Sequence, residues 1–144
     1  MNTKFVTGLV LLMFIFSCRD LQKKPPILKT PNIIGTWKLN SYQYGERERQ
    51  MMPNNIQKIK LITPTHFNWI QYDTKDRVVT NSAGGKYSFD GKNYIESIYF
   101  AGSEMISFIG KENKFLINVE GDTLYLSGQI SDNLKIYEVW IKLE

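Results

Sequence analysis

The sequence predicts an all-β fold, namely an up-and-down antiparallel β-barrel of about 8–10 strands in the part of the chain after residue 31. Aromatic residues make up 13% of the 144 residues, and this enrichment favours strands over helices. Short strand-like segments follow one another between turn signals such as Asp90-Gly91 and Glu120-Gly121, which are typical of hairpins. Consecutive hairpins imply a meander, and closing a meander into a barrel removes its exposed edges. A β-sandwich is the alternative that the spacing of the hairpins leaves open.

The expected strands are short, and a recognisable break bounds each of them. Residues 56–63 alternate apolar and lysine side chains with a period of two, and Pro64 ends this strand. Residues 45–55 are highly charged and indicate a loop or one helical turn, while Gly84-Gly85 indicates a hinge or a bulge. The expected strands are 35–44, 56–63, 66–73, 77–80, 86–89, 93–101, 104–109, 113–119, 122–129 and 134–143.

The first residues have the pattern of a secretory signal peptide rather than of a folded element. Lys4 precedes an apolar run over residues 5–16, which is shorter than the roughly 20 residues that a membrane-spanning helix needs. We therefore expect residues 1–17 to be a signal peptide.

Ile15-Phe16-Ser17-Cys18 resembles the bacterial lipobox, in which the cysteine is lipidated and becomes the new N-terminus. Cys18 is the only cysteine of the chain, so it cannot form a disulfide within the chain. The resemblance implies a lipid-anchored protein of the bacterial cell envelope, on the periplasmic or the surface side of the outer membrane. An ordinary secretory signal with an incidental cysteine is the alternative.

Residues 18–31 are rich in proline and lysine and indicate an extended tether between the anchor and a domain over residues 32–144. The formal net charge of +4 is small, and its lysines and arginines are scattered along the chain. This charge pattern gives no reason to expect a nucleic-acid partner.

Gly35-Thr36-Trp37 at the start of the first expected strand resembles the Gly-x-Trp signature of lipocalins and fatty-acid-binding proteins, the calycin barrels. In those barrels the tryptophan closes one end beneath a basic side chain of the last strand. The resemblance therefore implies a barrel closure made by Gly35, Trp37, Trp140 and Lys142.

Residues 63–69 and Glu138-Val139-Trp140 resemble a group of uncharacterised bacterial lipocalin-like secreted proteins, which implies a fold but no established activity. The helix-turn-helix lid of the fatty-acid-binding proteins has no counterpart here, because residues 45–55 are too few and too charged to form it.

Alternate residues of a barrel strand point inward, so polar residues on apolar faces are candidates for a binding site. Glu96 and Glu138 lie on such faces and need a partner or a raised pKa. On strand 66–73 we expect the face that holds His66 and Tyr72 to point inward. The candidate ligand-binding residues are His66, Trp69, Tyr72, Tyr87, Glu96, Phe100 and Glu138. A barrel core packed with side chains is the alternative to a cavity.

The residue inventory argues against common catalytic centres. One histidine and one cysteine rule out His-rich zinc sites and Cys–His nucleophiles, and no Gly-x-Ser-x-Gly elbow occurs. We expect no catalytic residue, no metal and no cofactor.

The sequence favours a membrane-anchored binding protein for a small amphipathic or hydrophobic ligand in the bacterial envelope. A packed barrel that engages an envelope protein or a glycan is the second hypothesis. A small hydrolase or isomerase that uses Glu96 or Glu138 as acid or base is the third.

Overall fold

A computed structural model of the chain describes residues 32–130 and 133–144. The expected signal peptide (residues 1–17), the lipidation site Cys18 and the tether (18–31) lie outside the described residues, so these expectations stay predictions. The described residues correspond to the expected domain.

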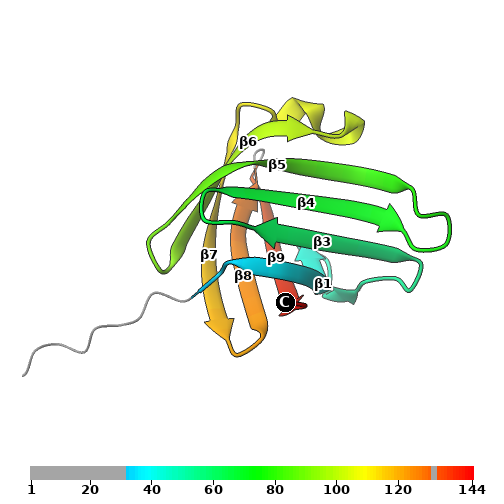
Figure 1. Cartoon of the computed structure of the whole chain (residues 1–144), viewed down its shortest axis with the longest axis horizontal. Coiled ribbons are helices and arrows are strands. Elements are labelled where there is room, and N and C mark those ends of the chain that lie inside the picture. Colours follow the sequence, from blue (N-terminus) through cyan, green and yellow to red (C-terminus); the bar gives the residue numbers. More distant parts are fainter. Residues whose placement is uncertain (1–31, 131–132) are drawn as a thin grey trace, which may run out of the picture.

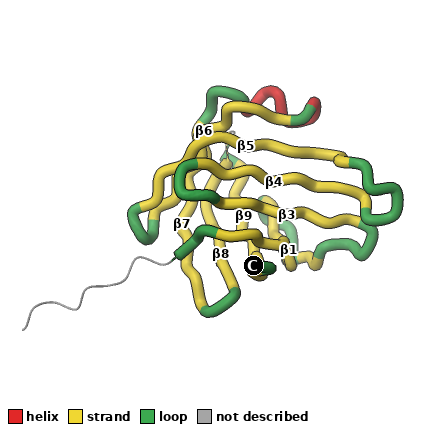
Figure 2. Tube along the Cα trace, viewed as in Figure 1, coloured by secondary structure: helices red, strands yellow, loops and turns green. Residues whose placement is uncertain are grey.

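The described chain forms a closed antiparallel β-barrel of eight strands, to which one very short strand is added (Figures 1 and 2). The order in the sheet is β2-β1-β3-β4-β5-β6-β7-β8-β9, and β1 also pairs with β9. Apart from the short β2, strands that follow one another in the sequence are neighbours in the sheet. The predicted all-β, up-and-down barrel is therefore confirmed, and the sandwich alternative is excluded. The strands are β1 (Gly35–Tyr44), β2 (Gln50–Met51), β3 (Ile56–Ile62), β4 (His66–Asp73), β5 (Val79–Phe89), β6 (Asn93–Ala101), β7 (Glu112–Glu120), β8 (Thr123–Ile130) and β9 (Leu134–Lys142).

Three expected strands differ from the observed elements. Residues 77–80 and 86–89 were expected as separate strands, but residues 79–80 and 86–89 belong to the single strand β5 and residues 77–78 precede it. The pairing of β5 with β4 and β6 continues through Gly84-Gly85. The register shift at this glycine pair leaves Tyr99 of β6 as the extra residue, so Gly84-Gly85 lies opposite a bulge of β6 and does not separate two strands.

Residues 104–109 were expected as a strand, but Ser103–Phe108 form the 3-10 helix η1, which is the red segment in Figure 2. Pairing between β6 and β7 extends only from Asn93 to Ser97 on β6, so no strand partner is available for this segment. The chain instead leaves the barrel wall after β6 and returns to it at β7.

Residues 45–55 form a loop, as expected, with the two-residue strand β2 inside it. β2 pairs with Ser41 and Tyr42 of β1, beyond the point where β3 stops pairing with β1 at Lys38. This loop therefore covers the place where β1 and β3 diverge.

One end of the barrel is closed by tryptophan packing. Trp37 and Trp140 expose 1% and 0% of their surface, and the indole N–H of Trp37 donates to the Ile33 carbonyl at 2.8 Å. Trp37 and Lys142 are direct partners across the β1–β9 seam, and the Lys142 Nζ lies 5.7 Å from the Trp37 ring centroid. This is the arrangement that the Gly-x-Trp motif predicts, and the cation–π contact contributes about 0.5–2 kcal/mol.

Gly35 is required where the chain enters this closed end. Its φ of 145° is disfavoured for residues with a side chain, and an added Cβ would lie 2.7 Å from the Glu144 carbonyl oxygen. The absence of a side chain lets the Thr36 N–H donate to the Glu144 carbonyl at 3.0 Å while the Leu143 N–H donates to the Thr36 carbonyl at 2.8 Å. Gly35 thus allows the two ends of the described chain to meet.

Replacing Trp37 with alanine should lower the free energy of unfolding by about 3–5 kcal/mol, because the change leaves a cavity in a closed core. Urea denaturation measures the effect. The matched control is Leu61→Ala on the neighbouring strand β3, because the Leu61 side chain is 42% exposed. This variant should lose far less unfolding free energy. A near-neutral Trp37→Ala variant would show that the indole does not close this end.

Candidate functional site

The barrel interior holds a cavity of about 210 Å³. Its walls are the inward faces of the strands, and Met105, Ile130 and Leu134 come from segments at the end farthest from Trp37. Polar and apolar groups share the lining, which is the composition of ligand sites in general. The lining residues are Tyr44, Lys58, Lys60, Trp69, Gln71, Asn81, Glu96, Met105, Asn113, Phe115, Ile130, Leu134, Ile136 and Glu138.

Two lysines of β3 point into the barrel, although apolar residues alternate with them along the strand. Lys60 is buried on the same face as Ile62, whereas Leu61 between them is 42% exposed. Glu96 of β6 and Glu138 of β9 are buried in the same interior, and each needs a positive partner. This need explains why the two lysines point inward. The period-two alternation of β3 is evident in the sequence, but by itself it does not identify these lysines as site residues.

The first ion pair joins opposite walls of the barrel. Lys60 Nζ of β3 donates to Glu96 Oε1 of β6 at 2.8 Å, and both side chains are almost fully buried. The Lys60 ammonium also lies 5.2 Å from the Trp140 ring centroid and 5.8 Å from that of Tyr94. The aromatic faces and the carboxylate together replace the water that this ammonium loses.

The second ion pair lies closer to the open end and belongs to a larger network. Lys58 Nζ lies 3.4 Å from Glu138 Oε1, and the Tyr44 hydroxyl donates to the same oxygen at 2.7 Å. The indole N–H of Trp140 donates to the other carboxylate oxygen at 3.1 Å. Lys58 Nζ also lies 4.2 Å from the Trp69 ring centroid.

This network determines the charge state of the cavity. Burial alone would raise the pKa of Glu138, but the charges of Lys58 and Lys60 and the hydrogen bonds from Tyr44 and Trp140 hold it below its ordinary value. Burial and the adjacent Glu138 carboxylate raise the pKa of the Tyr44 hydroxyl. At neutral pH the site thus contains an ionised Glu138 and a neutral tyrosine that donates to it.

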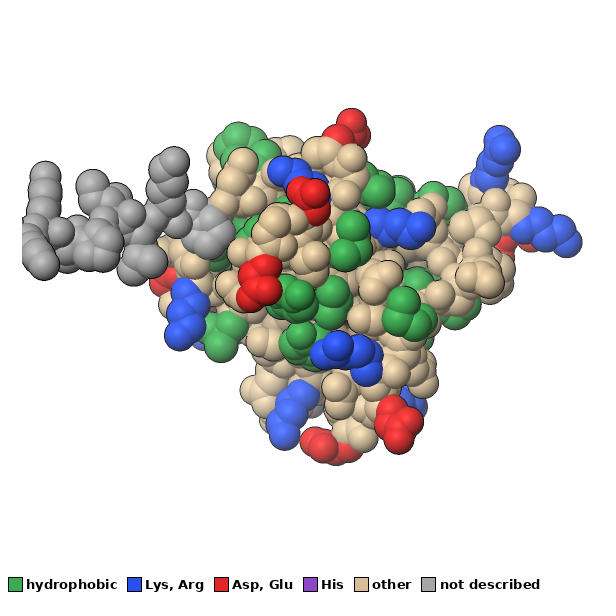
Figure 3. All heavy atoms as spheres, turned by 90° about the horizontal axis from the view of Figure 1, so that it is seen from below, with side chains coloured by type: hydrophobic (Ala, Val, Ile, Leu, Met, Phe, Trp, Pro, Cys, Tyr) green, Lys and Arg blue, Asp and Glu red, His purple; other side chains and the backbone are tan. Residues whose placement is uncertain are grey.

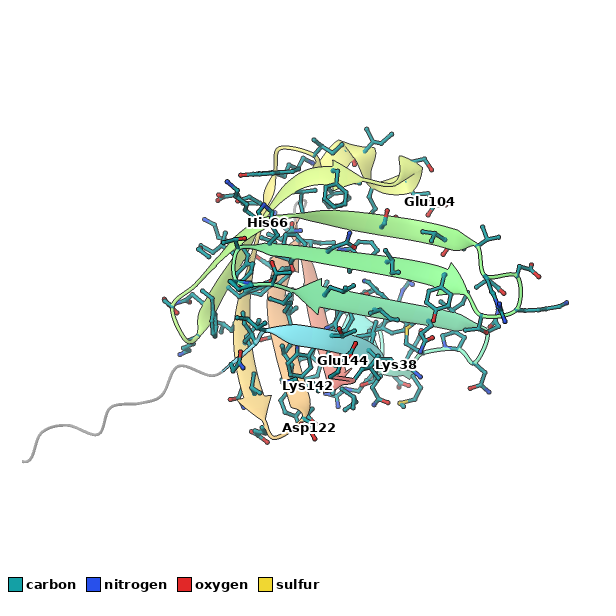
Figure 4. All side chains as sticks on the ribbon, in the orientation of Figure 1. Lys38, His66, Glu104, Asp122, Lys142 and Glu144 are labelled. Carbon is teal, nitrogen blue, oxygen red and sulfur yellow. The ribbon has the colours of Figure 1, made fainter. Side chains whose placement is uncertain are left out.

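The expected orientation of β4 is wrong. Phe67 and Trp69 are buried, whereas His66 is exposed, with its Nδ1 2.7 Å from the Thr65 hydroxyl oxygen. Figure 4 labels His66 at one end of the barrel and Glu104 of η1 at the opposite end. The strand follows the hydrophobic effect, since Phe67 and Trp69 bury far more apolar surface than His66 and Asn68 would.

Tyr72 shares the outer face of β4 with His66 and is only half-buried. Its hydroxyl donates to the Gln57 side chain on the neighbouring strand. The structure therefore does not bring His66 and Tyr72 into the cavity with the other candidate residues.

Phe100 was expected beside the cavity but lies outside, where it is 48% exposed. Tyr99 is an extra residue of β6 in the register shift opposite Gly84-Gly85, and the bulge turns Phe100 to the outer face. The ring covers Gly84, where an added Cβ would clash with it. Period-two alternation along β6 therefore predicts the inward position of Glu96 correctly and that of Phe100 wrongly.

Tyr87 lies near the closed end and is half-buried. Its ring centroid is 5.0 Å from that of Tyr94, and its hydroxyl donates to the Thr63 carbonyl at 2.7 Å. Tyr87 therefore supports the closed end and does not line the cavity. Of the seven candidate residues, the structure brings Trp69, Glu96 and Glu138 together around it.

A second hollow of about 290 Å³ adjoins the cavity where β1 and β3 diverge. It shares Tyr44 and Gln71 with the cavity and is bordered by Arg47, Met52 and Pro53 of the covering loop. An elongated molecule in the cavity has room to continue into this hollow.

Within the described residues, no group of three or more His, Cys, Asp or Glu side chains is arranged to hold a metal ion. In the same part of the chain, no helix has the length and apolar character that crossing a bilayer requires. Positive and negative side chains are interspersed on the face seen in Figure 3, and no continuous basic stripe crosses that face.

Comparison with known proteins supports the fold and leaves the function open. No protein-family model matches the sequence, and no curated protein matches it. The structure is similar to the crystal structure of an uncharacterized protein from Bacteroides eggerthii DSM 20697, with a TM-score of 0.56 and 14% sequence identity. The match covers 77% of this chain and 99% of the other chain.

Replacing Glu138 with glutamine should lower the free energy of unfolding at pH 7 by about 3–5 kcal/mol, since it leaves a buried lysine without its charged partner. The folded pKa of Glu138 is depressed, so ionisation stabilises the fold above the ordinary glutamate value of about 4.3, and this contribution is lost as the pH falls further. Urea denaturation between pH 7 and pH 3 measures the free energy of unfolding of both proteins. The difference in this free energy between wild type and variant should become smaller as the pH falls.

The control is Glu46→Gln, which removes an exposed ion pair with Lys135 and should change stability little at any pH. If the unfolding free energies of Glu138→Gln and wild type differ by a constant amount from pH 7 to pH 3, Glu138 is not ionised in the folded protein as assigned here.

Proposed function

We propose that this protein binds a small amphipathic molecule inside its barrel. The observation that carries the proposal is the interior cavity, whose deep wall holds two buried ion pairs while its outer part is lined by apolar side chains. Buried ion pairs are seldom the most stable way to fill a core, because apolar residues of similar size often do better. Their presence beside a cavity supports a role in recognising the polar end of a ligand.

The size of the cavity limits the ligand to a small molecule. A volume of about 210 Å³ corresponds to roughly seven water molecules at about 30 Å³ each in the liquid. A short chain with one head group fits these dimensions, and the adjoining hollow offers room for a longer tail.

Binding is favoured over catalysis because the two carboxylates are already engaged. Glu96 and Glu138 each accept a hydrogen bond from a lysine, and the depressed pKa of Glu138 makes it a weak base. We therefore propose a binding protein rather than a hydrolase or isomerase.

We further propose that the barrel is held in the bacterial envelope by a lipid on Cys18. The lipobox resemblance of residues 15–18 and the tether-like composition of residues 18–31 support this location. Two or more acyl chains suffice for stable anchoring.

Isothermal titration calorimetry with 1-hexanol, hexanoate and hexyltrimethylammonium tests the binding function. At least one of these probes should bind the wild-type domain, and Ile136→Phe, which adds volume inside the cavity, should weaken that binding tenfold or more. The matched control is Ile141→Phe on the outer face of the same strand, which should bind as wild type does. Binding that both variants leave unchanged would place the site elsewhere and refute the proposal.

Cell fractionation of a Cys18→Ala variant tests the anchor. The wild-type protein should be in the membrane fraction, and the variant should be released from it or remain as an uncleaved precursor of higher mass. A variant that is processed normally and still sediments with the membranes would contradict lipid anchoring.

A further inference from the structure

The Lys58 ammonium lies in a setting that is typical of a binding site for an organic cation. Its Nζ is 4.2 Å from the Trp69 ring centroid, 5.9 Å from that of Trp140 and 3.4 Å from Glu138 Oε1. The Tyr44 hydroxyl completes the surroundings, because it donates to the same carboxylate oxygen. Indole faces combined with a carboxylate are the groups that proteins use to recognise ammonium ligands.

Lys58 is also the member of the charge cluster that is best able to leave. Its side chain is 12% exposed, whereas those of Lys60, Glu96 and Glu138 are 3–4% exposed. Its ion pair is the longer one, at 3.4 Å against 2.8 Å for Lys60–Glu96. A lysine side chain is long and flexible, so its ammonium can move toward the open end while its backbone stays in β3.

The balance of charge then selects the ligand. With Lys58 inside, two lysines face two carboxylates, and the four charges compensate one another. When the Lys58 ammonium moves out into water, one negative charge near Glu138 is left uncompensated in a poorly solvated interior. A monovalent cation restores the balance, whereas a carboxylate ligand would add a third negative charge beside Glu96 and Glu138.

We infer that the ligand carries an organic ammonium group, and that the Lys58 side chain occupies the ammonium site until the ligand displaces it. This inference rests on the proposed function and specifies its ligand class. The ligand ammonium takes the place between Trp69 and Glu138, and its apolar part lies along Phe115, Ile130 and Ile136 toward the open end. Lys58 thereby competes with the ligand and lowers its apparent affinity.

Calorimetric titration of wild type and Lys58→Met with the three hexyl probes tests the inference. Wild type should bind hexyltrimethylammonium more tightly than 1-hexanol or hexanoate. Lys58→Met should bind hexyltrimethylammonium at least tenfold more tightly than wild type does, because the internal competitor is gone and the carboxylate remains. The matched control is Lys38→Met at an exposed lysine of β1, which should leave the affinity unchanged.

Thermal melting of each variant checks that it is folded, and Lys58→Gln serves as a second variant with an uncharged polar end. Loss of hexanoate binding in the Lys58 variants would overturn the inference by making Lys58 an anchor for anions. A probe that binds in the cavity, is blocked by Ile136→Phe and shows no preference for the ammonium head would overturn the inference and leave the binding function standing. Failure of all three probes to bind would overturn both.

Discussion

Closure of the sheet between β1 and β9 is the constraint on which the other features depend. Once Trp37 and Lys142 meet across this seam, each of the eight barrel strands has a neighbour on both sides, and one face of each must point into a shared interior. Any charged residue on that face is then cut off from water. The two ion pairs follow from this requirement, because an interior carboxylate persists only beside a positive partner.

The barrel is packed at one end of its axis and hollow toward the other. At the closed end, Trp37 and its neighbours fill the interior, and the backbone of Glu144 lies against Gly35. Toward the open end the core gives way to a cavity with charged and amide groups on its walls. Trp140 links the two regions, since its ring is fully buried and its indole N–H donates to Glu138.

The fold could be predicted from the sequence because it depends on local signals. Turns such as Asp90-Gly91 set the hairpins, and the hairpins set the order of the strands. The Gly-x-Trp motif and the spacing of Trp140 and Lys142 placed the closed end. The segment of η1 has apolar residues that suit a strand, but its backbone forms local hydrogen bonds, such as Met105 N–H to the Gly102 carbonyl, and no strand pairs with it in the described residues.

The site could be predicted only in part, because it depends on which face of each strand is buried. Glu96 and Glu138 were identified as buried charges, but their partners Lys58 and Lys60 look like solvent-facing residues in the sequence of β3 alone. His66 lies on the outer face because Phe67 and Trp69 bury a larger apolar area on the inner one, whereas both faces of this strand carry large side chains in the sequence. Phe100 was misplaced because one extra residue in a bulge reverses the alternation, and a bulge cannot be located from period-two patterns.

The central claim is that the buried charges compensate one another as pairs and do not make the fold more stable than apolar residues in their place would. Urea denaturation of Lys60→Met, Glu96→Leu and the double variant tests this most directly. Each single variant should lose about 3–5 kcal/mol of unfolding free energy, because it leaves one buried charge alone, and the double variant should return to within about 1 kcal/mol of wild type or exceed it. The claim would be contradicted if the double variant lost as much unfolding free energy as the two single variants lose together.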